Sequence, residues 1–93
     1  MKEKIYIVRS CYVANGIMFN DNKRYIKDAD NANSIYEETL KNMIADNSDM
    51  VEDKENYKTA KTNRKNYRSY ECYYKYAPHV SNFVVELCSE NLE

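Results

Sequence analysis

The stretch KIYIVRSCYVANGI, residues 4–17, decides the fold of this chain. Residues 4–14 are rich in β-branched and aromatic types, which strands prefer. Asn15-Gly16 follows directly and predicts a type I′ hairpin turn, because both positions of that turn need positive φ. An interior strand is indicated by apolar side chains on both faces, with Ile5, Ile7, Cys11 and Val13 on one and Tyr6, Val8 and Tyr12 on the other.

The second strand of this hairpin is predicted to begin at Ile17. Residues 17–19 make only a short apolar run, and the Asn-Asp-Asn of residues 20–22 is typical of another turn. Residues 24–26 then resume a strand pattern. Two interpretations stay open, a third strand or a continuation of the second.

A helix is predicted in the middle of the chain. Ser34 and Glu37 form an S-x-x-E capping box after the polar run 28–33, so we expect the helix over residues 35 to about 45. Its apolar residues recur at the i, i+4, i+7 and i+8 spacing of one helix face, at Tyr36, Leu40, Met43 and Ile44.

Residues 49–64 have two interpretations. Acidic residues near position 49 suit the first turn of a second helix, with Asn47 or Ser48 as its N-cap. The apolar content is thin, because only Met50, Val51, Tyr57 and Ala60 form a narrow edge. The segment is therefore either a mostly solvated helix or a long polar connection.

The C-terminal third is predicted to be a second hairpin. From Tyr67 the pattern has period two, and residues 77–82, with Pro78, supply a turn. One face of the first strand carries Tyr70, Cys72, Tyr74 and Tyr76, the other carries Glu71, Tyr73 and Lys75, and Phe83, Val85 and Leu87 point inward from the second strand.

These elements predict a small α+β domain. Two hairpins flank one or two central helices, and a helix packs on one face of an antiparallel sheet. We expect a single domain over residues 1–91, and we interpret residues 92–93 as the remnant of an expression tag. Tyr70, Tyr74 and Tyr76 are expected to be core or cross-strand residues rather than stacking platforms.

The composition argues against an enzyme. The chain has one glycine, one proline and one histidine in 93 residues, so a glycine-rich phosphate loop is excluded. Three widely spaced cysteines without a CxxC pair argue against a disulfide framework and a zinc site, and we expect buried thiols and no cofactor. A pair of Cys72 or Cys88 with His79 is conceivable, but both cysteines occupy strand positions that look structural.

The chain shows no membrane or export signal. No stretch approaches the roughly 20 apolar residues that span a bilayer, and the N-terminus lacks the apolar region of a signal peptide. We therefore expect a cytoplasmic protein without a membrane partner.

Charge is separated along the chain. Residues 28–53 hold eight acidic residues against Lys41, a local net charge of −7, and residues 54–75 hold seven basic residues against Glu55 and Glu71, a local net charge of +5. The formal net charge of the whole chain, −1, conceals these opposed blocks.

The leading hypothesis is a non-enzymatic interaction protein that binds or occludes a protein partner. Phages and mobile elements encode small single domains of this size and composition as inhibitors, including the anti-CRISPR type, and this analogy of kind makes such an inhibitor the narrower expectation. The contact residues are predicted to be Glu37, Glu38, Asp49, Glu52, Asp53 and Tyr73.

The alternative hypothesis is nucleic-acid binding by residues 54–76. If residues 50–68 were helical, the basic residues would form a continuous stripe that tracks a phosphate backbone, beside tyrosines that stack on bases. The residues are Lys54, Lys58, Lys61, Arg64, Lys65, Arg68 and Tyr67. The same charges also suit a solvated face.

A homodimer is a further expectation, because the free sheet edges of the two hairpins could be covered by a second copy.

Overall fold

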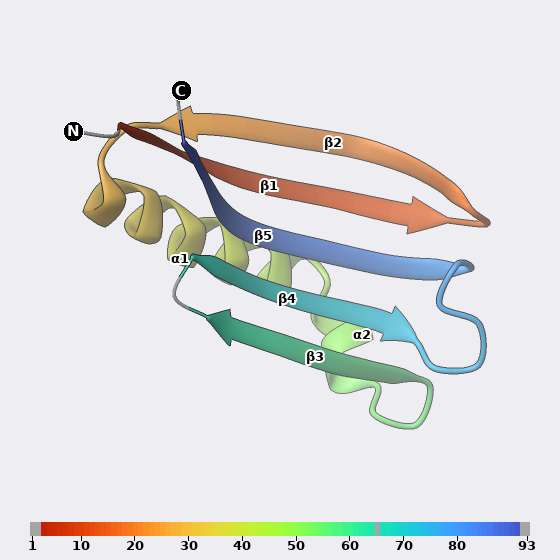
Figure 1. Cartoon of the computed structure of the whole chain (residues 1–93). Helices are drawn as coiled ribbons and strands as arrows, with labels where there is room; N and C mark the ends of the chain where they lie inside the picture. Colours follow the sequence, from red (N-terminus) through yellow and green to blue (C-terminus); the bar gives the residue numbers. More distant parts are fainter. Residues whose placement is uncertain (1–2, 65, 92–93) are drawn as a thin grey trace.

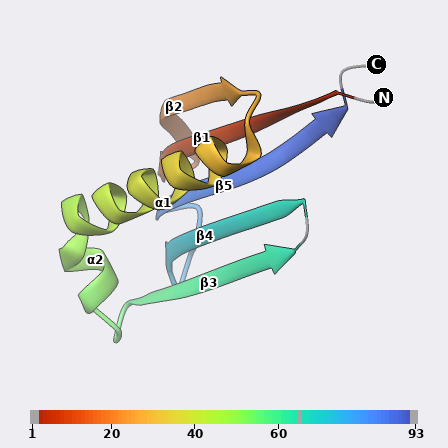
Figure 2. The same cartoon turned by 90° about the vertical axis from the view of Figure 1, so that its left-hand side faces the viewer.

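The computed structural model describes residues 3–64 and 66–91 and confirms the predicted α+β architecture. Seven elements follow one another as β1 (Lys4–Ala14), β2 (Ile17–Ile26), α1 (Ala29–Asp46), α2 (Ser48–Glu52), β3 (Tyr57–Arg64), β4 (Tyr67–Tyr74) and β5 (Ser81–Asn91). The strands form one antiparallel sheet in the order β2-β1-β5-β4-β3 (Figure 1). Both helices lie on the same side of this sheet (Figure 2).

The N-terminal hairpin has the predicted turn and the predicted position. Asn15 and Gly16 have φ values of 52° and 78°, as a type I′ turn requires. β1 pairs with β2 on one side and β5 on the other, so it is an interior strand. β2 is continuous, because the turn signal around Asn20 is a bulge in which that residue takes a φ of 51°.

α1 begins earlier than the capping box predicts. Asp28 is the N-cap, and its carboxylate accepts a hydrogen bond from the Asn31 backbone N–H at 2.8 Å. Asp28 caps as well as serine does, and the added turns bury Ala32 completely against the sheet. Neither helix of the described residues is both long and apolar enough to cross a membrane.

The segment 49–64 is neither a long helix nor a loop. α2 is a short helix that ends at Glu52, and residues 57–64 form β3, an edge strand paired with β4. Most of β3 is exposed, so it lacks the apolar alternation of a half-buried strand. β3 is a strand because its backbone pairs with β4, and the sequence pattern gives no sign of this pairing.

The C-terminal hairpin is formed by β4 and β5 as predicted. β5 is the middle strand of the sheet, and Phe83, Val85 and Leu87 are buried. Tyr70 is also buried, but Tyr76 is 67% exposed, so the prediction of a core position is wrong for Tyr76. Tyr76 lies in the connection beyond the end of β4, where its ring packs edge-on against Tyr74 at the surface.

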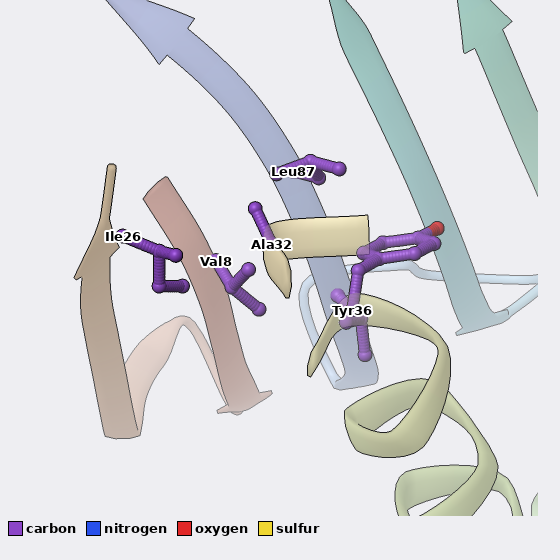
Figure 3. Packing of buried hydrophobic residues seen from close by; sticks show 6 residues of the cluster. Val8, Ile26, Ala32, Tyr36 and Leu87 are labelled. Carbon is purple, nitrogen blue, oxygen red and sulfur yellow. The ribbon is translucent and has the colours of Figure 1, made fainter. Parts of the chain in front are cut away.

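The core lies between α1 and the sheet in two adjoining clusters. Figure 3 shows the first cluster, in which Tyr36 and Ala32 of α1 face residues of β1, β2 and β5. Arg68 of β4 lies over the Tyr36 ring at 4.6 Å and donates to Asn33 and Glu37, so it joins α1 to the sheet. The second cluster centres on Tyr70, Cys72 and Phe83.

Candidate protein-binding groove

α1 covers only part of the sheet and leaves a groove beside β3. The helix packs over β1 and β5 (Figure 2). A helix is about 10 Å wide, whereas five strands at about 4.8 Å spacing are about 24 Å wide, so one helix cannot cover them all. α2 contacts β3 at one end. The helix side of β3 and β4 therefore stays partly open.

The open part forms a cavity of about 640 Å³ between α2 and β3. A second cavity of about 280 Å³ continues along β3 and β4 past Tyr36 and Leu40, and shares Lys61 and Tyr70 with the first. We call this continuous trough the β3 groove. The larger cavity is lined by Ile44, Val51, Glu52, Lys54, Tyr57, Lys58, Thr59, Lys61 and Tyr70.

The floor of the β3 groove is apolar and held in place. Ile44 and Val51 come from the two helices, and Tyr57 and Tyr70 come from the sheet. Tyr57 packs edge-on against the Tyr74 ring at 5.6 Å, and its hydroxyl donates to Ser81 Oγ at 3.2 Å. Such a floor can accept apolar side chains of a partner without first rearranging.

The rim of the groove is basic. Lys54, Lys58 and Lys61 line the larger cavity, against a single carboxylate, Glu52. Lys61 Nζ lies 5.9 Å from the centre of the Tyr70 ring, which places a cation directly over the floor. A rim with this charge excess attracts carboxylates and repels cations.

The groove is bordered by an open strand edge. In the described part of the chain β3 pairs with β4 alone, and it is the last strand of the sheet. Alternate N–H and C=O groups of an edge strand point away from its neighbour and are free to pair with another strand. An apolar floor, a basic rim and free backbone groups therefore meet at one place.

The residues predicted to bind a protein partner do not form one surface. Glu37 and Glu52 line the β3 groove, while Glu38 and Asp49 are exposed on the helices. Asp53 accepts hydrogen bonds from Asn56 Nδ2 and supports the turn that leads to β3. Tyr73 lies on the opposite face of the sheet, because it alternates with the buried Cys72.

The prediction of a continuous basic stripe is wrong, because the stripe requires a helix and residues 57–64 form the strand β3. Lys58 and Arg64 are attached on the face of β3 opposite to Lys61. The Lys58 side chain nevertheless reaches the groove from the edge of the strand. Arg68 is held by α1, as described above. Lys65 lies outside the described residues.

Tyr67 is also engaged within the fold. Its hydroxyl donates to Glu86 Oε2 at 2.7 Å, and this hydrogen bond, with burial, raises the pKa of Tyr67. The tyrosine is therefore tied to β5 and not free to reorient toward a base.

The thiols are poor nucleophile candidates. Burial raises the pKa of all three, Cys11, Cys72 and Cys88, so each stays protonated at neutral pH. Cys88 lies about 23 Å along β5 from the strand's first residue, and His79 precedes that strand. Among the described residues, no group of three or more His, Cys, Asp or Glu side chains is arranged to hold a metal ion.

The structure also shows an apolar tip, which the sequence pattern does not predict, at the end of the sheet where β3 begins. The β1–β2 turn meets the β4–β5 connection there, where the Gly16 N–H donates to the His79 carbonyl at 2.7 Å. Ile17, Phe19 and Val80 are exposed around this contact. The signal for it in the sequence is the apolar run directly after the Asn-Gly turn, which by itself predicts only a strand.

No family model, no curated protein and no solved structure matches this chain. The functional argument therefore rests on the groove.

Proposed function

We propose that this chain is a non-enzymatic interaction protein that binds an extended segment of a protein partner in the β3 groove. The observation that carries the proposal is the coincidence of the apolar floor, the lysine rim and the open edge of β3. Each feature alone is common on protein surfaces, whereas together they match the three parts of an extended peptide: its side chains, its charges and its backbone.

The mode of binding is strand addition. A segment that pairs with β3 places alternate side chains on the helix side of the sheet, where Val51 and Tyr57 provide an apolar floor. Carboxylates along the segment lie within reach of Lys58 and Lys61 on the rim. The partner is therefore a protein with an exposed extended segment that is apolar at alternate positions and acidic between them.

A protein partner is favoured over nucleic acid by the groove itself. Its floor contains the aliphatic side chains Ile44 and Val51, and its walls contain the carboxylates Glu37 and Glu52. A phosphate backbone would share the attraction to the lysines, but it gains nothing from an aliphatic floor or from a free strand edge. The narrower proposal, an inhibitor carried by a phage or mobile element, rests on size and composition only.

The test is selection of displayed random peptides on the immobilised protein. We expect the recovered peptides to share alternating apolar residues with intervening Asp or Glu, and to be lost when Val51→Asp replaces the apolar floor. An exposed substitution away from the groove, Ile17→Asp, is the control and should leave the selection unchanged.

The proposal would be overturned by peptides that bind the Val51→Asp variant equally well. It would also be overturned if an oligonucleotide panel bound the protein with an affinity that collapses between roughly 50 and 200 mM salt, as phosphate contacts do.

A further inference from the structure

The face of the sheet opposite the helices is covered by no element of the described residues (Figure 2). We call it the open face. By strand alternation its two central strands, β1 and β5, present two patches of apolar side chains, one on each side of Arg9 and Glu86. These are Ile5, Ile7, Cys11, Val13, Val84 and Cys88. An antiparallel sheet that meets water on one face normally carries polar residues there, so this composition indicates a covered surface.

Charged residues of both signs lie between and around these two apolar patches. Arg9, at the middle of β1, is paired with Asp21 at 2.9 Å and Glu86 at 3.3 Å. Because Lys58 reaches the β3 groove, the cations of the face are Arg9, Lys23 and Arg64, and the anions are Asp21, Glu71, Glu86 and Glu90. This nearly balanced charge gives no attraction to nucleic acid and only weak repulsion between two copies of the face.

We infer that a second copy of this chain packs on the open face. The two sheets then form a sandwich in which the apolar patches of each copy flank its central Arg9–Glu86 ion pair, whose charges are already compensated within the copy. Strands of eight to eleven residues, at about 4.8 Å spacing and about 3.3 Å per residue, give the face an area of about 750 Å². A standard interface buries about 800 Å² on each partner, so one face supplies the area that a stable dimer needs.

The open face also provides an anchor and a hollow. A shallow cavity of about 260 Å³ is lined by Ile7, Arg9, Cys88 and neighbouring residues, and Tyr25 stands at its border with 64% of its surface exposed. Exposed tyrosines that enter a partner's hollow are common anchors of interfaces. A twofold arrangement uses each such contact twice.

The sandwich leaves both β3 grooves accessible, because the grooves lie on the helix side of each sheet. The inference is thus independent of the proposed function, and its consequence is a bivalent protein with two outward binding sites.

The test is sedimentation equilibrium of the full chain across the micromolar range. We expect a monomer–dimer equilibrium that Tyr25→Asp weakens by at least about tenfold. Tyr76→Asp is a matched control, because Tyr76 is 67% exposed but lies beyond β4, where its ring packs against Tyr74. Circular dichroism of both variants verifies that the fold is retained.

Three outcomes would overturn the inference. The wild-type chain could remain monomeric throughout the range, Tyr25→Asp and Tyr76→Asp could have equal effects, or the dimer could depend on the edge of β3 instead, as shown by its loss on Thr59→Pro with no loss on Tyr25→Asp.

Discussion

Replacing Phe83 with alanine is expected to lower the free energy of unfolding by about 3–5 kcal/mol. Phe83 is fully buried on the middle strand of the sheet, and its ring lies 6.0 Å from Tyr70 and 6.3 Å from Tyr12. The truncation leaves a cavity in the second core cluster, between the sheet and helix residues such as Leu40 and Met43. Since a small domain has about 5–15 kcal/mol in total, this change removes a large share of the stability.

Urea unfolding followed by circular dichroism measures the effect. Ile17→Ala is the control, because Ile17 is 69% exposed and its truncation should change the free energy of unfolding by less than about 0.5 kcal/mol. A loss below about 1 kcal/mol for Phe83→Ala would contradict the placement of this side chain at the centre of the core.

Reversing the charge of the groove rim is expected to weaken peptide binding by about 10- to 100-fold. Lys58→Glu with Lys61→Glu turns two attractive contacts with acidic side chains into repulsive ones beside an apolar floor. The substitutions lie on an edge strand and are exposed, so the fold is retained. Isothermal titration with a peptide recovered by selection measures the loss.

The matched control is Lys4→Glu with Lys27→Glu, which changes the net charge equally at exposed sites away from the groove. Equal losses in the two double variants would show that the peptide responds to overall charge, and would contradict a role for the rim.

The sequence predicts the helices and strands that have one buried face. It misses the strand that is mostly exposed and the contacts that depend on the tertiary fold. β1 with its Asn-Gly turn, the inward face of α1 and the β4–β5 hairpin all carry a clear period, because one face of each meets the core. β3 does not, because an edge strand with exposed lysines and threonines has no buried face to mark.

The candidate site was predictable in residue types but not in arrangement. The sequence marks Lys58 and Lys61 as basic and Val51 and Tyr57 as an apolar edge, but its pattern predicts either a helix or a long connection and not a strand. Their meeting in one groove depends on β3 folding back beside β4 and on α1 being too narrow to cover the sheet. Local sequence patterns show neither the pairing of β3 with β4 nor the width of α1 relative to the sheet.

Nuclear magnetic resonance of the isotope-labelled protein, titrated with a selected peptide, tests the groove most directly. The binding mode predicts shift changes concentrated on the backbone amides of β3 and on Val51 of α2, with outward β3 amides becoming protected from solvent exchange. Shift changes confined to the exposed side of α1 around Glu38, or to the open face around Tyr73, with β3 unchanged, would contradict it.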